Sequence, residues 1–293
     1  MTTQLRLAFI ADIHANLPAL EAVVADLHGQ APDRVYHLGD LVNRCPWPGE
    51  VLDLVATAGW AGIYGNHDYV VARLKTPENR TPFTDRDRFR DLWWTAGALT
   101  PAQLHMLYDL PETRLLEFPG APALRLIHGV PGNCYWGLFE AASDDELRKQ
   151  VESVQEPAIV SAHTHRPLDR QVDRWRLFNP GSVGMPYNED PRAQYCLLDL
   201  VEARGVRTWQ ARFRQVDYDR DLLPIGFYAG DFAVGMGPLL ELNLRTALSG
   251  HAYISDFGYW LRDQSPALKA DLGQAVSEYL ARHGPGQWAF ELA

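Results

Sequence analysis

The fold is indicated first by residues 5–16, which read LRLAFIADIHAN. Residues 5–11 form a compact apolar run, and this run predicts a strand that ends at Asp12. Asn16 then suits the cap position of a helix, because Pro18 follows just inside it and apolar residues recur at helical spacing. A buried strand is therefore expected to run directly into polar residues and a helix.

The same arrangement returns twice in the next fifty residues. Residues 35–38 predict a strand that ends at Gly39-Asp40, and residues 61–64 predict a strand that ends at Gly65-Asn66, with a helix over 50–58 between them. This alternation of strands and helices predicts an α/β domain. Open α/β sheets bind ligands beyond the carboxyl ends of their strands, so we expect a site at these ends.

The later part of the chain changes in texture. Residues 1–216 are expected to form the core, and 217–293 a C-terminal extension with a loose, glycine-bearing start. The extension is expected to pack on the core, to cover the mouth of the site or to form a dimer contact, and the sequence leaves these three open. Helices are expected over 85–99, 101–110, 144–154, 238–249 and 266–282, and strands over 113–118, 124–127, 159–162, 175–178, 195–200 and 206–213.

Composition excludes several classes of protein. The 293 residues are 46% hydrophobic, and 27 Lys+Arg against 37 Asp+Glu leave a net charge of −10. A disordered chain is therefore excluded, and neither a signal peptide nor a membrane span is visible. The three widely spaced cysteines form no disulfide framework or zinc ribbon. We expect a soluble, cytoplasmic protein that binds neither membranes nor nucleic-acid polymers, and that uses bound metal if it handles phosphates.

Metal-type ligands follow several of the expected strands. Asp12 and His14 lie at i and i+2, so their side chains would share one side of the segment if it is extended. His163 and His165 repeat that spacing. A lone histidine such as His128 is more often a structural residue, so no single motif decides the chemistry. Together the side chains offer more nitrogen and oxygen ligands than one ion needs, which predicts two divalent cations about 3.5–4 Å apart. The expected ligands are Asp12, His14, Asp40, Asn66, His128, His163 and His165.

In their order along the chain, these motifs resemble those of the calcineurin-like metallophosphoesterase superfamily. The run NPGSVG at 179–184 resembles a glycine-rich turn of its small bacterial and archaeal phosphodiesterase branch, while Ala162 stands where the family usually has Gly. The resemblance implies a four-layer α/β/β/α sandwich of two facing mixed sheets with flanking helices and metals at the edge of the sheets. The motifs are Asp12-x-His14, Gly39-Asp40, Gly65-Asn66-His67-Asp68, His128 and His163-Thr164-His165.

The resemblance also implies a role for each ligand. One ion would be held by Asp12, His14 and His165, the other by Asn66, His128 and His163, and Asp40 would bridge them. A water between two cations has a pKa near neutrality, so hydroxide would be the nucleophile that attacks phosphorus. The ions would be Mn, Fe, Ni or Zn, since nitrogen and oxygen ligands suit each of these.

Four further residues are candidates for contact with substrate. His67 would protonate or stabilise the leaving oxygen, with Asp68 orienting its ring; the alternative is that His67 caps the turn. Arg44 lies in a segment that resembles the protein-phosphatase and diadenosine-tetraphosphatase branch, and is either a phosphate clamp or an exposed loop charge. Asn16 is either a helix cap or a group near the metals.

We therefore expect a metal-dependent hydrolase of small phosphodiesters or phosphomonoesters with nucleotide-like character. A dinucleoside polyphosphate hydrolase or a protein phosphatase on the same fold is the first alternative, suggested by Arg44. A non-catalytic metal-binding scaffold is the second, and the presence of His67 argues against it. The expected partner is a small phosphate ester, and a homo-oligomer is left open.

Overall fold

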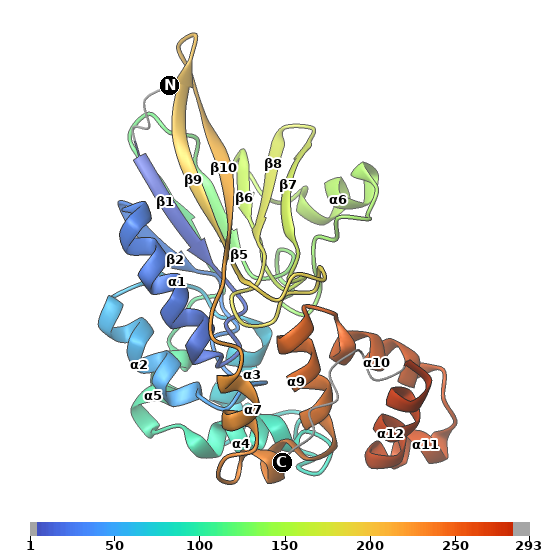
Figure 1. Cartoon of the computed structure of the whole chain (residues 1–293). Coiled ribbons are helices and arrows are strands. Elements are labelled where there is room, and N and C mark those ends of the chain that lie inside the picture. Colours follow the sequence, from blue (N-terminus) through green and yellow to red (C-terminus); the bar gives the residue numbers. More distant parts are fainter. Residues whose placement is uncertain (1–4, 284–293) are drawn as a thin grey trace.

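Two five-stranded sheets lie face to face in the computed structural model, which describes residues 5–283 (Figure 1). Helices pack on the outer face of each sheet, so the layers run helix, sheet, sheet, helix. The predicted four-layer sandwich of two mixed sheets is confirmed. None of the helices described has the length and the apolar composition needed to cross a bilayer.

The first sheet has the order β10-β9-β1-β2-β3. Strand β1 pairs in parallel with β2 and antiparallel with β9, and β9 forms a long hairpin with β10 (Figure 1). Its strands are β1 (Leu5–Ile10), β2 (Arg34–His37), β3 (Ala61–Gly62), β9 (Ala193–Ala203) and β10 (Val206–Val216).

The second sheet has the order β4-β5-β6-β8-β7. Strands β5, β6 and β8 are parallel, and the two edge strands run antiparallel to their neighbours. Strand β7 was not predicted, because only two of its six residues are buried and it shows no apolar run. The strands are β4 (Thr113–Leu116), β5 (Leu124–Ile127), β6 (Ala158–Val160), β7 (Pro167–Val172) and β8 (Trp175–Pro180).

Alternate residues of β1 explain why the strand reads as a continuous apolar run. Leu7 and Phe9 pack into the core between the two sheets, whereas Ala8 and Ile10 pack against helices on the outer face. All four side chains are fully buried, and each large one stabilises the fold by about 1.5–3 kcal/mol. The loop that begins after β1, with Asp12 and His14, therefore starts from a rigidly packed strand.

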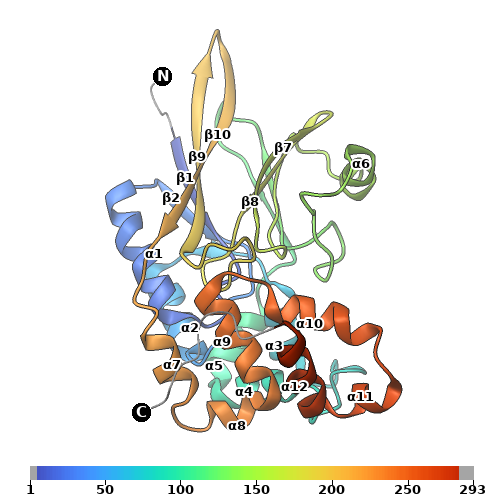
Figure 2. The ribbon, with the colours of Figure 1, turned by 45° about the vertical axis from the view of Figure 1, so that its right-hand side comes forward.

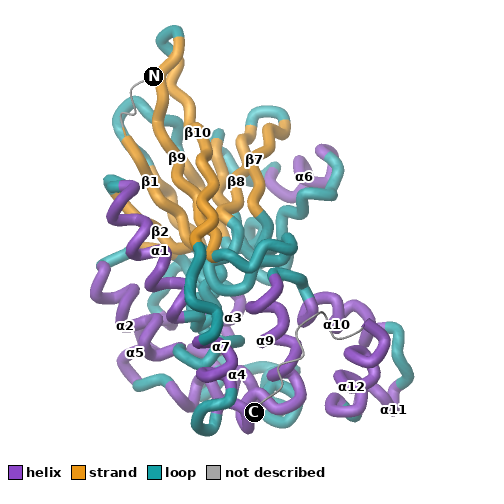
Figure 3. Tube along the Cα trace, in the orientation of Figure 1, coloured by secondary structure: helices purple, strands orange, loops and turns teal. Residues whose placement is uncertain are grey.

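In the part of the chain that the structure describes, five helices share the core cluster on the outer face of the first sheet, and one helix shares that of the second. Figure 3 draws the helices in purple and the strands in orange. The helix predicted from residue 85 starts at Arg90 instead, because residues 85–89 form turns in which Asp85 accepts backbone hydrogen bonds. The helices are α1 (Leu17–Gln30), α2 (Pro48–Ala58), α3 (Asn66–Arg73), α4 (Arg90–Ala98) and α5 (Pro101–Tyr108), with α6 (Asp144–Val151) on the second sheet.

The chain beyond β10 is helical, and it packs under the ends of the strands (Figures 1 and 2). Its core cluster includes Ala15, Cys45 and Met185, which lie in loops of the sandwich. Two expectations were wrong here: the loose region contains two short helices, and the helix over 266–282 is broken at Asp271. The elements are α7 (Leu222–Phe227), α8 (Phe232–Met236), a 3-10 turn (Gly237–Leu239), α9 (Leu240–Ser249), α10 (Tyr253–Arg262), α11 (Pro266–Ala270) and α12 (Leu272–His283).

Helix α10 was not predicted at all, although its apolar residues recur at helical spacing. The division of the chain into a core of 1–216 and an extension of 217–293 stays a prediction; β10 ends at Val216.

Candidate metal centre

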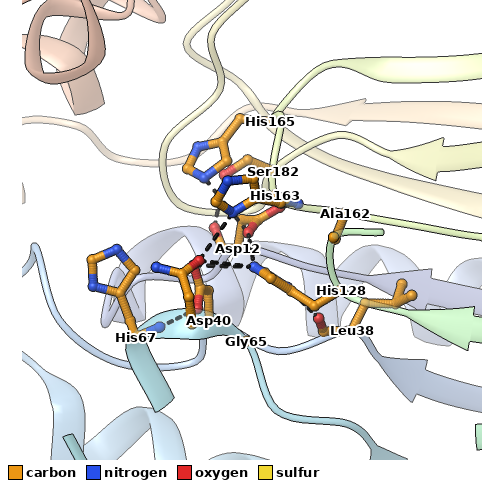
Figure 4. Close-up of polar contacts among 12 residues, drawn as sticks. Asp12, Leu38, Asp40, Gly65, His67, His128, Ala162, His163, His165 and Ser182 are labelled. Carbon is orange, nitrogen blue, oxygen red and sulfur yellow. Dashed lines mark hydrogen bonds and ion pairs between the residues drawn. The ribbon is translucent and has the colours of Figure 1, made fainter. Parts of the chain in front are cut away.

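The seven predicted ligands lie together at one edge of the two sheets. Figure 4 shows five of them: Asp12, Asp40, His128, His163 and His165. The seven ligands follow five strand ends: β1 leads to Asp12 and His14, β2 to Asp40, β3 to Asn66, β5 to His128, and β6 to His163 and His165. Parallel strands end at the same edge of a sheet, which is why residues as far apart in sequence as His14 and His165 meet here.

The backbone at five of the seven predicted ligands is left-handed, not extended. Positive φ angles occur at Asp12 (52°), His14 (50°), Asp40 (51°), His163 (69°) and His165 (56°). Non-glycine residues seldom adopt this region, and each costs about 1–2 kcal/mol. The extended segments expected at Asp12-x-His14 and His163-x-His165 were therefore predicted wrongly, although the paired residues do converge. Strain of this kind gathers at functional sites.

Two glycines allow the loops after β2 and β3 to touch. A Cβ atom on Gly65 would overlap the Asp40 carboxylate, and one on Gly39 would overlap the backbone nitrogen of Gly65. Gly39 also has a φ of 87°, which glycine adopts without strain. The backbone N–H of His67 donates to Oδ1 of Asp40 over 2.8 Å, so this close approach fixes the Asp40 carboxylate.

The turn at 179–184 holds two of the ligand loops. The Ser182 hydroxyl donates to the backbone carbonyl of Asp12 over 2.7 Å. The Asn179 amide donates to the carbonyl of Ala162 over 2.9 Å and to the Thr164 hydroxyl over 3.0 Å. The polar residues of this turn thus position the Asp12 loop and the loop that carries His163 and His165.

Asp12, His14 and His165 form one group of possible ligands. The Nε2 atoms of the two histidines lie 3.1 Å apart, and Oδ1 of Asp12 lies 3.5 Å from Nε2 of His165. Nδ1 of His165 donates to the carbonyl of Met185 over 2.5 Å, so the lone pair of Nε2 faces the group. Oδ1 of Asp12 is buried and has no hydrogen-bond partner within the described part of the chain.

Asp40, His128 and His163 form a second group, and Asn66 adds an amide oxygen to it. Nδ1 of His128 donates to the carbonyl of Leu38 over 2.7 Å, and its Nε2 lies 3.4 Å from Oδ2 of Asp40. Oδ1 of Asn66 lies 2.9 Å from Nδ1 of His163. Oδ2 of Asp40 also lies 3.7 Å from Nε2 of His14, so Asp40 stands between the two groups.

Burial keeps most of the histidines neutral. It lowers the pKa of His163 to about 4 and of His165 to about 3, and it lowers the pKa of His14 well below its ordinary value. Burial opposes the charge of Asp40 too, but the neighbouring His128 and His67 outweigh it and hold its pKa well below the usual range. Burial raises the pKa of Asp12.

Neutral imidazoles, a carboxylate and an amide oxygen are therefore available at pH 7. These are ligands that first-row divalent cations accept. A buried oxygen without a hydrogen bond is costly, and a cation bound to Oδ1 of Asp12 would remove that cost. The residues present fit a metal centre.

His67 lies beside the ligands, with its ring held by a residue that the sequence analysis did not single out. The Asn43 amide nitrogen lies 2.9 Å from Nδ1 of His67 and 3.2 Å from Oδ2 of Asp91. The Asn43 amide oxygen accepts from the Thr95 hydroxyl over 3.1 Å. Because the Asp91 carboxylate can only accept, Asn43 presents its NH₂ group to His67, and Nδ1 must accept. The ring proton of neutral His67 is then on Nε2.

Asp68 makes contacts other than the expected one. Its Oδ1 accepts from the backbone N–H of Leu41 over 2.9 Å, and its Oδ2 accepts from that of Gly65 over 3.1 Å. The ring nitrogen that Asp68 was expected to orient is held by Asn43 instead, so that contact was predicted wrongly. Asp68 is buried and ties the loop of Asp40 to the start of α3.

Arg44 and Asn16 differ in how much of their side chain is free for substrate. Arg44 and His67 line a cavity of about 200 Å³ that the candidate ligands surround, called the metal cavity below. The Arg44 guanidinium lies 4.0 Å from the Asp91 carboxylate. Asn16 caps α1 by accepting from the backbone N–H of Ala19, and its amide nitrogen donates to the carbonyl of Gly184 over 2.9 Å. The cap is thus present in the structure, and a substrate role for Asn16 stays a prediction.

Comparisons with known proteins agree with this geometry. The profile of the calcineurin-like phosphoesterase superfamily domain matches residues 5–203. An uncharacterised protein of Methanocaldococcus jannaschii is 27% identical over 66% of this chain and 82% of its own, and a probable metallophosphoesterase of Methanothermobacter thermautotrophicus is 26% identical over 40% and 64%.

Two solved structures resemble the fold closely. A metallophosphoesterase from Sphaerobacter thermophilus has a TM-score of 0.65 at 26% identity, covering 84% of this chain and 99% of its own. A hypothetical protein from Pyrococcus horikoshii has a TM-score of 0.67 at 21% identity with the same coverage, a likeness in fold alone.

Proposed function

The chain belongs to the calcineurin-like phosphoesterase superfamily, and on that premise we propose that it hydrolyses small phosphate esters with two divalent metal ions. The substrates are nucleotide-like phosphodiesters or phosphomonoesters. The observation that carries the proposal is the convergence of two ligand groups on the carboxylate of Asp40, with ring lone pairs turned inward and one oxygen of Asp12 unpartnered.

Each of the two groups of side chains would hold one ion. Asp12, His14 and His165 would hold the first, and Asn66, His128 and His163 the second, with Asp40 shared. When bound, the ions would supply hydroxide at neutral pH and offset the negative charge on the phosphoryl oxygens. The Leu38 and Met185 carbonyls accept from Nδ1 of His128 and His165, so each ring, when neutral, would present its Nε2 lone pair to an ion.

His67 would stabilise charge on the substrate through its Nε2–H. A charged ring would carry a proton on Nδ1 as well, directed at the NH₂ group of Asn43, and two donors cannot pair. The contact therefore favours a neutral ring that donates a hydrogen bond over one that transfers a proton. Of the two expected roles of His67, stabilisation of the leaving oxygen is the one that this geometry supports.

Arg44 would contact a phosphate oxygen, because its side chain lines the same cavity as His67 and is only partly engaged by Asp91. This supports the phosphate clamp over the exposed loop charge. It is also the observation that favours the alternative activity, hydrolysis of dinucleoside polyphosphates.

The test is hydrolysis of 4-nitrophenyl phosphate and bis(4-nitrophenyl) phosphate by protein loaded with manganese, nickel or zinc. The proposal predicts metal-dependent turnover of at least one ester, and loss of that turnover in His128→Ala. Binding of metal without turnover of any ester would favour the non-catalytic scaffold.

A further inference from the structure

A second, larger cavity opens beside the metal centre. It has a volume of about 1080 Å³, and Arg44, Asn66 and His67 line both this cavity and the smaller one of about 200 Å³ at the ligands. Its inner end is therefore continuous with the place where a phosphate ester would react. A cavity of this size holds far more than a phosphate group, since drug-sized ligands occupy about 300–1,000 Å³.

One wall of this cavity is a single face of helix α10. The lining residues of the helix are Ile254, Phe257, Gly258, Leu261 and Arg262, spaced at i, i+3, i+4, i+7 and i+8. Ile254 also lines the metal cavity. At 1.5 Å per residue, Arg262 lies about 12 Å along the helix from Ile254. The face is apolar near the metal centre and ends in a cation.

Positive charge gathers at the far end of that face. Lys269 lines the cavity too, and its Nζ donates to the backbone carbonyl of Arg262 over 2.6 Å. Among residues 5–283, neither Arg262 nor Lys269 forms an ion pair. Another part of the lining, from residues 83–92, carries Arg88 with Asp85, Asp87 and Asp91, and Asp85 accepts hydrogen bonds from the backbone N–H groups of Asp87 and Arg88. The lining residues of α10 and α11 carry the two cations and no carboxylate.

The middle of the wall has no side chain. Gly258 is exposed, and a Cβ atom placed on it would meet no other atom within 4 Å. Phe257 beside it is buried, and its ring packs against Trp260 and Tyr279. A flat group of the substrate can therefore approach the helix backbone closely at this point.

We propose that this cavity binds the leaving group of the substrate, and that the substrate is an extended phosphate ester with an apolar, flat middle and a second anionic group at its far end. The inference rests on the proposed function and deepens it, because the reacting phosphate lies at the metal centre and the second anion pairs with Arg262 and Lys269. The helices beyond β10 thereby determine specificity, while the sandwich supplies the chemistry.

Three aryl phosphates of increasing length test this, each as the monoester and as its methyl diester: phenyl, biphenyl-4-yl and 4′-carboxybiphenyl-4-yl. Their phosphonate analogues, titrated calorimetrically into manganese-loaded protein, measure binding without turnover. Wild-type protein should prefer the carboxylated biphenyl compound to the biphenyl compound by roughly 10–100-fold, the worth of a charge-assisted hydrogen bond.

Two variants locate the preference. Gly258→Leu fills the middle of the cavity and should lower the ratio of biphenyl to phenyl activity about tenfold or more. Arg262→Ala with Lys269→Ala should remove the preference for the carboxylated compound alone. Gly97→Leu in α4 is the matched control, because Gly97 is also an exposed helix glycine with an open Cβ position, and it should keep both ratios.

The outcomes separate the two proposals. If the esters are turned over but the activity ratios among the three compounds are the same in wild type and in the variants, the cavity inference is overturned. The proposed hydrolase function would then still hold. The predicted order of binding without any turnover would support the cavity and overturn the proposed function. Equal binding of all three phosphonates would contradict the cavity inference outright.

Discussion

The side-chain amide of Asn43 donates a hydrogen bond to Nδ1 of His67 over 2.9 Å. The same amide is fixed on both sides, since it also donates to Asp91 and accepts from Thr95. These partners lie on α4, so the orientation of the His67 ring depends on a helix that carries none of the predicted metal ligands. Asn43 is a positioning residue in this account.

Asn43→Ala should leave His67 in place but free its ring to turn. We expect kcat to fall by roughly 10–100-fold, because misplacing a reacting group by about 1 Å costs this much, while KM changes little. Steady-state kinetics on a chromogenic ester, with metal content measured in parallel, checks this. A loss of metal instead of kcat would mean that Asn43 supports the ligands and not His67.

His67→Ala should lower kcat by about 10²–10⁴-fold, the range of a positioned polar catalyst. His67 also belongs, with His14 and Asp40, to a third group of atoms close enough to hold an ion. Elemental analysis decides between the two roles: the account predicts unchanged metal content. If one ion per chain disappears with the side chain, His67 is a ligand and its proposed contact with substrate is wrong.

The convergence of the seven candidate ligands could be predicted from sequence because they come shortly after apolar strands. Strand ends of an α/β sheet meet at one edge, so the chain order of Asp12, Asp40 and Asn66 was sufficient to bring them together. The left-handed backbone at Asp12 and His165 could not be seen in that pattern, because asparagine, aspartate and histidine tolerate it without a sequence signature.

Contacts between side chains on separate elements could not be predicted from the sequence. Asn43 lies close to Asp40 in sequence, yet its bond to His67 depends on how α3 and α4 pack. Asp68 adjoins His67 in sequence but points to the backbone of Leu41 and Gly65, since side chains at i and i+1 of a helix diverge. The approach of α10 to the metal cavity likewise depends on tertiary packing.

Loading with metal should raise the Tm of the protein by several degrees, and a chelator should reverse the change. An ion that binds only the folded state stabilises it by about 2.7 kcal/mol at 100 times its Kd. Differential scanning calorimetry with and without manganese measures this. In Asp40→Ala, which removes the shared carboxylate, the shift should be largely lost; an equal shift in that variant would place the ion elsewhere.

Stability should also depend on pH through Asp26, away from the metal centre. Its carboxylate accepts from Arg214 over 2.7 Å and from the Tyr195 hydroxyl over 2.6 Å, and the bond from Arg214 lowers its pKa below 3.8. Because the unfolded chain binds the proton more readily, this stability is present above pH 3.8 and is lost as pH falls through the lower, folded pKa.

Asp26→Asn should therefore lower the free energy of unfolding at pH 7 by about 1–3 kcal/mol, and by less at pH 3. Urea denaturation at both pH values measures the difference. Asp109→Asn, at an exposed carboxylate, is the control and should show little effect. A deficit that is the same at both pH values would show that Asp26 contributes packing and not charge.

The central claim is that seven side chains from five strand ends hold two ions around Asp40. Anomalous diffraction from crystals of the manganese-loaded protein tests it most directly. The account predicts two peaks about 3.5–4 Å apart, one bonded to Asp12, His14 and His165, the other to Asn66, His128 and His163, with Asp40 between them. A single peak, or peaks that do not flank Asp40, would contradict it.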